Sequence, residues 1–222
     1  MQDPDIPRSG KCGNKVSRRS QHGQLTYDLV IPANPRTPPQ VAVRDIRRAL
    51  AARWRQLSEN QRVRWNEDAA KHQSNPRLHQ SGPLTGWNLF HKLNLPLAYY
   101  GRPQLDLPSP FPRFPRPAVS ALGITNGPGG IKITLTCPHD PGEHTVLRAS
   151  FPQSARKKAW TDFRFFAFCP APVSGSADIT ALYTSRFGFP WIGSKIFLRV
   201  NQMIAGWEDA PRDFAAVVPP PA

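Results

Sequence analysis

The spacing of apolar residues predicts a helix that begins near residue 38. Thr37 is suited to the N-cap, Pro38 to the first helical position, and Gln40 completes a capping box. Apolar residues then recur at intervals of three and four, at Val43, Ile46, Leu50, Trp54 and Leu57. This spacing predicts one packing face and leaves most of the arginines off it.

A second helix is predicted by another capping box, formed by Ser58 and Gln61. Trp65 and Ala69 continue its apolar face, and the Asn-Pro pair at residues 75–76 is expected to end the helix.

A third helix is predicted from residue 85 toward residue 101. Thr85 can serve as its N-cap, and Leu84 with Leu89 forms a hydrophobic staple. The three predicted helices carry four large aromatic residues, Trp54, Trp65, Trp87 and Phe90. Because each buried aromatic side chain removes about 150 to 250 Å² from water, we expect these four to form the core of a small bundle.

Beyond residue 117 the apolar period changes from helical spacing to two. Ile131, Ile133 and Leu135 alternate with polar residues after the turn signal at residues 126–130. Similar runs predict strands at residues 119–125, 144–149, 163–168, 196–200 and 214–218. Six or seven short strands indicate an antiparallel β-sandwich. Residues 178–183 fit a helical turn, which we favour, or an irregular strand between sheets.

These patterns predict an α+β protein, with a small three-helix N-terminal domain and a C-terminal antiparallel β-sandwich. We expect a basic flexible arm at 1–33, the helical domain at 34–100, a proline-rich linker at 101–117 and the sandwich at 118–222. The linker holds six prolines and no helical or alternating pattern, which is typical of a semi-rigid extended spacer. A proline-rich ligand for another protein's aromatic groove is the alternative.

Charge is distributed unevenly along the chain. The net charge is +14, and residues 1–117 hold 19 Lys and Arg against 8 Asp and Glu. Such a field attracts polyanions such as nucleic acid or an acidic protein surface, although it also serves solubility. The candidate polyanion-binding residues lie in the helical half and are Arg44, Arg47, Arg48, Arg53, Arg55, Arg62, Arg64 and Lys71.

No local motif indicates catalysis. The sequence has no nucleophile elbow, phosphate-binding glycine loop, H-E-x-x-H or paired zinc knuckle, so we predict no catalytic residues and no cofactor. Cys137, His139, His144 and Cys169 are residue types that suit zinc, but their spacing fits no common site, and we predict no metal.

The three cysteines are widely spaced, and we interpret them as reduced thiols. A disulfide between Cys137 and Cys169 is the alternative if these two residues end neighbouring strands. The sequence contains no membrane span or signal peptide, so we expect a cytoplasmic protein when it is made, with no membrane partner.

Two segments of the helical half resemble the HMG box. Trp54, Leu57, Ser58, Arg62 and Trp65 match its W-x-x-L-S-x-x-x-R-x-x-W pattern, and residues 84–90 resemble its first-helix motif. The order of the two motifs is reversed here. The resemblance implies a nucleic-acid-binding architectural protein as the alternative function.

A broader resemblance begins at the N-P-R-T-P-P-Q run of residues 34–40 and continues through Arg44, Trp54, Leu57 and residues 84–90. These motifs resemble uncharacterised proteins of bacteria and their phages, whose C-terminal regions are similar to fibronectin type III or immunoglobulin-like sandwiches. The resemblance implies a non-enzymatic structural or assembly protein, phage-derived or virion-associated. Its expected partners are protein neighbours in an oligomer or larger particle, with DNA as the alternative.

Overall fold

A computed structural model describes residues 9–21, 23–31, 36–74 and 82–221 of the chain. The chain divides into two compact units, Met1–Arg44 and Asp45–Ala222. Residues 34–35, which we expected to lead into the first helix, lie outside the described residues, and so does the pair at 75–76. The second helix already ends at Ala69, before the Asn-Pro pair that we expected to end it.

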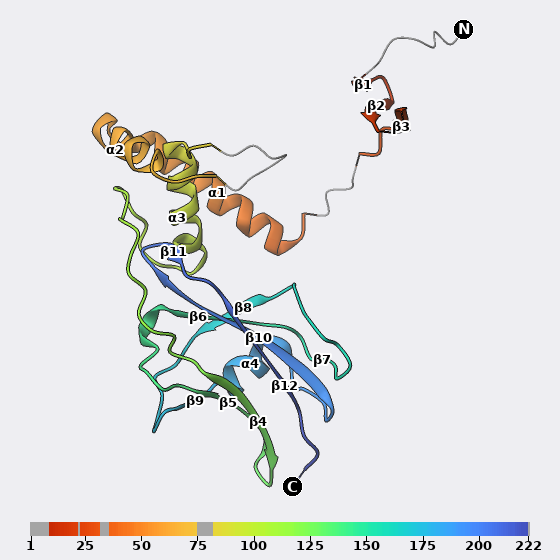
Figure 1. The fold of residues 1–222 in the computed structure, drawn as a ribbon, viewed down its shortest axis with the longest axis vertical. Helices are drawn as coiled ribbons and strands as arrows, with labels where there is room; N and C mark the ends of the chain where they lie inside the picture. Colours follow the sequence, from red (N-terminus) through yellow and green to blue (C-terminus); the bar gives the residue numbers. More distant parts are fainter. Residues whose placement is uncertain (1–8, 22, 32–35, 75–81, 222) are drawn as a thin grey trace. The chain divides into compact units, whose positions relative to one another are not determined.

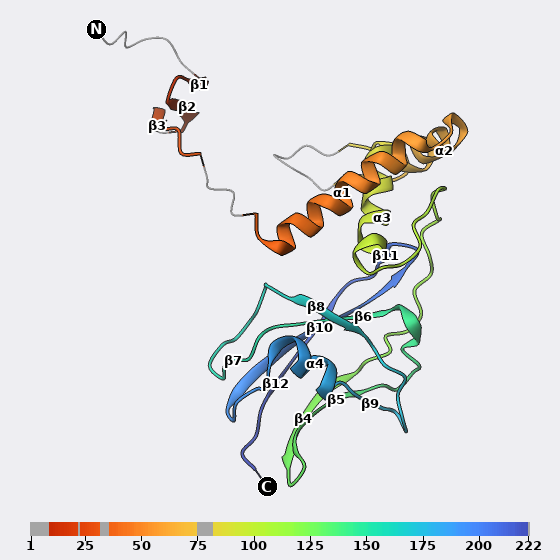
Figure 2. The same ribbon diagram turned by 180° about the vertical axis from the view of Figure 1, so that it is seen from behind.

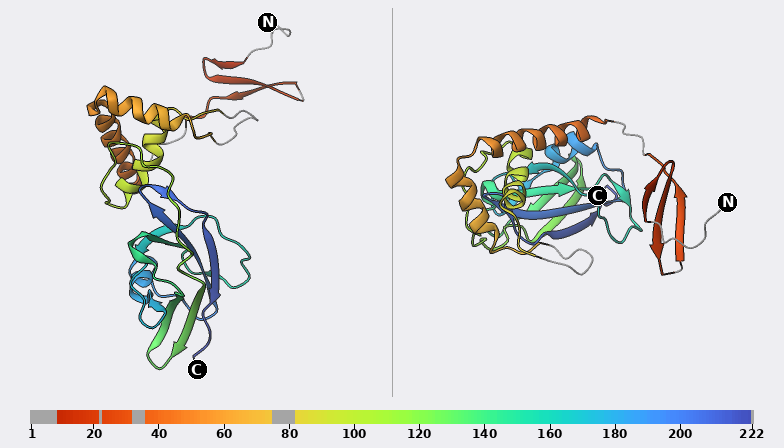
Figure 3. Two further views of the ribbon diagram at one scale, coloured as in Figure 1. Left: turned by 60° about the vertical axis from the view of Figure 1, so that its left-hand side comes forward. Right: turned by 90° about the horizontal axis from the view of Figure 1, so that it is seen from above.

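The N-terminal unit contains a small antiparallel sheet. Strands β1 (Gly10–Cys12), β2 (Lys15–Ser20) and β3 (Gly23–Asp28) pair in the order β1-β2-β3, and Figure 3 shows them side by side. Gly13 has a φ of 56° and forms the two-residue turn between β1 and β2 with Asn14. We expected a flexible arm in residues 1–33, and this sheet differs from that expectation.

Three helices follow, as the sequence predicts. They are α1 (Pro38–Gln56), α2 (Glu59–Ala69) and α3 (Gly86–Tyr99) (Figure 1). Ser58 and Gln61 form the reciprocal capping box at the start of α2, and the Thr85 side chain accepts a hydrogen bond from the Asn88 N–H at the start of α3. Each helix therefore begins where its local capping signal predicts.

The helices pack around the predicted aromatic residues. Trp65 and Phe90 are fully buried with their ring centroids 5.3 Å apart, and Trp54 lies 5.2 Å from Phe90. Trp87 packs against the same cluster. Trp207, which is more than a hundred residues farther along the chain, is also part of this core and was not predicted there.

Residues 101–117 contain no helix or strand, but they do not form a separate spacer. The Trp65 indole N–H donates to the Asp106 carbonyl (2.9 Å), and the Trp207 indole N–H donates to the Ser109 carbonyl (2.9 Å). Asn94 is fully buried, and its side chain accepts from the Leu105 N–H (2.6 Å). The expected domain boundary at residues 101–117 thus differs from the division at Arg44 and Asp45.

The C-terminal half consists of antiparallel sheets. One has the order β4-β5-β9, formed by Ala121–Gly127, Gly130–Thr136 and Ser176–Asp178. The other has the order β11-β10-β6-β8, with β12 and β7 also paired to β10. Its strands are β6 (Thr145–Ala149), β7 (Gln153–Ser154), β8 (Arg164–Phe168), β10 (Ser194–Ile204), β11 (Trp207–Glu208) and β12 (Arg212–Val217). Every strand predicted from the sequence is present.

A second hydrophobic core lies between these sheets (Figures 1 and 2). It joins Ile133 and Leu135 of β5 to Leu147 of β6 and Leu198 of β10. Helix α4 (Thr180–Phe187) adds Tyr183, whose hydroxyl donates to the Ser150 carbonyl (2.9 Å). The helical interpretation of residues 178–183 is confirmed.

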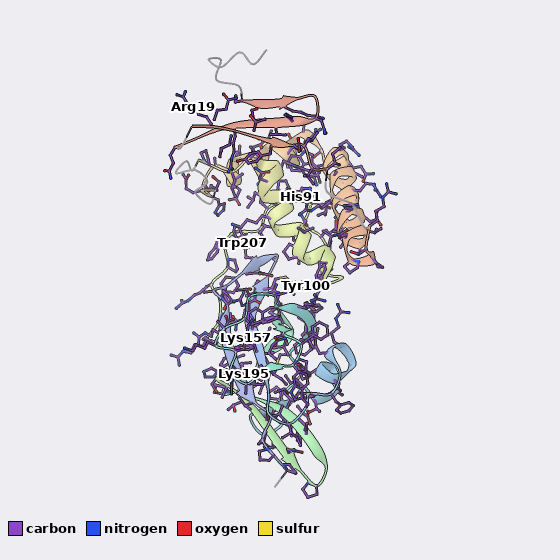
Figure 4. All side chains as sticks on the ribbon, turned by 90° about the vertical axis from the view of Figure 1, so that its right-hand side faces the viewer. Arg19, His91, Tyr100, Lys157, Lys195 and Trp207 are labelled. Atoms are coloured by element: carbon purple, nitrogen blue, oxygen red, sulfur yellow. The ribbon has the colours of Figure 1, made fainter. Side chains whose placement is uncertain are left out.

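The helices and the sheets are joined by direct contacts. Arg148 of β6 donates hydrogen bonds to the Tyr100 hydroxyl at the end of α3 and to the Glu208 carboxylate of β11 (2.7 Å). Lys92 of α3 lies over the Trp207 ring, with its Nζ 5.0 Å from the ring centroid. Figure 4 shows Tyr100 and Trp207 where α3 meets the strands.

Candidate polyanion-binding surface

Helix α1 carries most of the predicted cationic residues. Arg44, Arg48 and Arg55 are separated by four and seven residues, so they fall along one line of the helix, and all three are exposed. Leu50 lies on a different side of α1, and Leu57 follows directly after its last residue; both are buried in the helical core. The predicted division of this helix into a packing face and a cationic face is present.

Within the described residues, four of the eight candidates are seen to pair with a carboxylate. Three of these pairs link residues three apart on one helix or at its end: Arg48 with Asp45 (2.6 Å), Arg62 with Glu59 (3.5 Å) and Lys71 with Asp68 (3.2 Å). Exposed pairs of this kind contribute about 0.2–1 kcal/mol and can exchange for a ligand phosphate. They reduce the positive field of the surface without blocking it.

Arg53 contacts the proline-rich segment and stabilises its position on α1. Its guanidinium lies 2.8 Å from the Asp106 carboxylate and also donates to the Gln104 carbonyl (3.4 Å). It therefore fastens the proline-rich segment to α1, beside a surface cavity of about 270 Å³. Its removal would therefore disturb the fold as well as the surface charge.

Arg47, Arg55 and Arg64 are exposed, and no carboxylate within the described residues lies at ion-pair distance from them. They form the part of the candidate surface that is available to an anion, and we call them the unpaired arginines. His91, beside Arg47, adds no charge near neutral pH, because burial and then the Arg47 charge lower its pKa below the usual value.

The tryptophans between the arginines are unsuited to stack on bases. Trp65 is fully buried, while Trp54 and Trp87 pack edge to face with centroids 5.6 Å apart in the helical core. An aromatic wedge from this surface, which some architectural proteins use, would require the core to open.

The N-terminal sheet carries a second group of cations, Lys11, Lys15, Arg18 and Arg19, all exposed. Arg18 donates to the Tyr27 hydroxyl (2.7 Å) across β2 and β3, and Figure 4 labels Arg19 on the same sheet. We predicted a basic flexible arm here and no strands, although Leu25 and Tyr27 alternate with Thr26 and Asp28 in β3.

Cys137 and Cys169 are buried free thiols, and the Cys137 thiol donates to the Leu135 carbonyl (3.8 Å). Burial raises the pKa of both thiols, that of Cys169 to about 12, so neither is activated as a nucleophile. His139 and His144 are exposed. In the described part of the chain, no group of three or more His, Cys, Asp or Glu residues could hold a metal ion.

Comparisons of the chain with protein-family models, with curated proteins and with solved structures gave no significant match. Among residues 9–21, 23–31, 36–74 and 82–221, no helix combines the length and the apolar character needed to cross a membrane. The function must therefore be inferred from the arrangement of the residues themselves.

Proposed function

We propose that the protein is a non-enzymatic structural or assembly protein that holds protein neighbours in an oligomer or larger particle. The observation that supports this proposal best is the exposed apolar face of the N-terminal sheet. The resemblance of residues 34–40 and 84–90 to phage proteins supports a phage-derived or virion-associated role.

The register of the sheet defines that face. Val16 pairs with Tyr27 and Arg18 pairs with Leu25, so these four side chains share one face. Leu25 and Tyr27 are 38% and 43% exposed, and within residues 9–31 no described side chain is buried. A sheet of this size needs an apolar face covered by another element for stability, and a protein neighbour would supply that cover.

A photo-cross-linking amino acid in place of Tyr27 tests the proposal. In the producing cell, we expect irradiation to join the full chain to a second protein, giving one adduct of defined mass. The matched control carries the same amino acid at Phe111, which is 62% exposed in the second unit, and should give no such adduct. A chain with the cross-linker at Tyr27 that stays a free monomer after irradiation would contradict the proposal.

The strand order supports the finer proposal of an immunoglobulin-like or fibronectin type III-like sandwich. If β4, β5, β6, β8, β9, β10 and β12 are lettered A, B, C, C′, E, F and G, the sheets become A-B-E and G-F-C-C′. Immunoglobulin folds divide their strands in this way. Domains of this type commonly serve as binding modules, which agrees with an assembly role.

The alternative function is nucleic-acid binding through the helical half, as the HMG-box-like motifs imply. The unpaired arginines support it, because exposed guanidinium groups without carboxylate partners are suited to phosphate oxygens. In this structure the motif similar to the first HMG-box helix begins α3, so the order of helices still departs from that family.

Fluorescence anisotropy with a short labelled duplex tests this alternative. If each unpaired arginine contacts one phosphate, changing all three to Gln should reduce the slope of log affinity against log salt by about 0.9 per contact. A control with Arg116, Arg156 and Arg186 changed to Gln loses the same charge outside α1 and α2 and should keep most of the slope. Absence of binding by the unmodified chain near about 50 mM salt would reject the alternative.

A further inference from the structure

The loop between α4 and β10 exposes three large apolar side chains. Phe189, Trp191 and Ile192 are 80%, 57% and 55% exposed, whereas Pro190 between them is buried. The buried proline anchors the middle of the loop, so its neighbours project outward. A cluster of exposed apolar residues belongs to an interaction site more often than to a surface without a partner. We call residues 188–193 the apolar loop.

Hydrogen bonds hold the backbone of this loop at its C-terminal end. The Trp191 carbonyl accepts from the Ser194 N–H (3.0 Å) and from the Ser194 hydroxyl (2.6 Å). The Gly193 N–H donates to the Val218 carbonyl (2.9 Å). The apolar side chains are therefore presented on a fixed turn, and these backbone groups can leave water without losing their partners.

A basic turn lies beside the apolar loop. Strand β7 pairs with the first residues of β10, Ser154 opposite Ser194, and this pairing places the turn that follows β7 next to the end of the loop. The Lys195 ammonium donates to the Lys157 carbonyl (3.0 Å), and Figure 4 shows these two lysines close together. Lys157 and Lys158 are both exposed.

Few carboxylates offset this charge. Residues 151–195 contain six Lys and Arg but only two Asp and Glu. Asp162 pairs with Arg164 (3.4 Å), and Asp178 pairs with Lys132 (3.7 Å). The lysines next to the apolar loop therefore keep a net positive field.

We propose that the apolar loop and its basic turn dock on the surface of an anionic lipid bilayer. Tryptophan and phenylalanine are favoured at the boundary between headgroups and acyl chains, and lysines near the surface are attracted to anionic lipids. A second copy of the chain is a poor occupant, since a symmetric contact would bring two basic turns together. A projecting loop can also insert into a bilayer without a complementary pocket, which a protein partner would have to provide.

The apolar loop and the helical core lie at opposite ends of β10. The loop precedes Ser194, the first residue of β10, whereas Trp207 just beyond the other end of β10 packs in the helical core (Figure 1). Eleven residues of strand separate the two ends by about 35 Å. A chain docked through the apolar loop would keep α2 and α3, which pack with Trp207 in the helical core, away from the lipid.

Vesicle flotation with the full chain tests the proposal. We expect the protein to float with vesicles of phosphatidylcholine and phosphatidylglycerol at low salt, and to stay behind with phosphatidylcholine alone. Changing Phe189, Trp191 and Ile192 to Ser should reduce the bound fraction at least about tenfold, because the inserted apolar area is lost. Changing Lys157 and Lys158 to Gln should weaken binding about fivefold per lysine.

The matched control changes Leu107, Phe111 and Val173 to Ser, which removes three exposed apolar side chains elsewhere. It should float like the unmodified chain, and circular dichroism should show all variants folded. Three outcomes would overturn the proposal: no flotation of the unmodified chain, equal flotation of the loop variant, or flotation that depends on lysines alone. Loop-dependent self-association in analytical ultracentrifugation without vesicles would assign the loop to a second copy and would equally overturn it.

Discussion

Replacing Trp65 with Ala is expected to lower the free energy of unfolding by about 3–5 kcal/mol. The Trp65 side chain is fully buried, its ring packs edge to face on Phe90, and its indole N–H donates to the Asp106 carbonyl. Alanine would leave a cavity between α2 and α3 and would also remove one of the hydrogen bonds that hold the proline-rich segment to the helices. Urea denaturation followed by far-ultraviolet circular dichroism measures the change.

Trp191 provides the matched control, because it is the same residue type in an exposed position. Trp191→Ala should change stability by no more than about 0.5 kcal/mol. Equal losses in the two variants would mean that Trp65 does not occupy the centre of the helical core.

The helices could be predicted because their signals are local. The capping box of Ser58 and Gln61 and the N-cap at Thr85 each involve residues within one turn of the helix. The strand at residues 131–136 could likewise be read from alternation and from the turn that precedes it. Such signals specify an element without requiring knowledge of what packs on it.

Contacts between distant segments could not be predicted in the same way. Trp207 joins the helical core because the turn between β10 and β11 reaches α3, and no local pattern indicates which helix an aromatic residue will meet. The six prolines of residues 101–117 indicate an extended backbone correctly. They do not reveal that Leu105 and Asp106 bind side chains of α2 and α3.

The ion pairs of the candidate surface also divide into local pairs, which the sequence can predict, and distant pairs, which it cannot. The pairs Arg48 with Asp45 and Lys71 with Asp68 join residues three apart, so they could have been read from the sequence. The partner of Arg53 lies 53 residues away and could not. The number of cations available to a ligand therefore depends on tertiary contacts that the charge pattern alone does not contain.

Gly206→Ala is expected to separate the folding of the helices from that of the sheets. Gly206 has a φ of 80°, and a Cβ atom there would collide with the Leu93 carbonyl group of α3, with the carbonyl carbon only 2.7 Å away. Because the obstacle is backbone, α3 or the turn must move. Trp207 would then leave the helical core, and the contact of Arg148 with Tyr100 would weaken. We expect a loss of about 3–5 kcal/mol, comparable to truncating a buried aromatic residue.

The free-energy cost of the positive φ can be measured separately from the cost of the steric collision. Gly188 has nearly the same φ, 78°, with a ψ of 175°, but a Cβ atom there meets nothing within 4 Å, so Gly188→Ala should cost only the backbone strain, about 1–3 kcal/mol. Denaturation of the unmodified protein should show the Asp45–Ala222 unit unfolding in one transition. Gly206→Ala should show two unfolding transitions. The circular dichroism signal of the helices should be lost in the first, because the helical core then lacks Trp207. If Gly206→Ala instead unfolds in one transition and loses no more than Gly188→Ala, the turn between β10 and β11 does not hold the helices to the sheets.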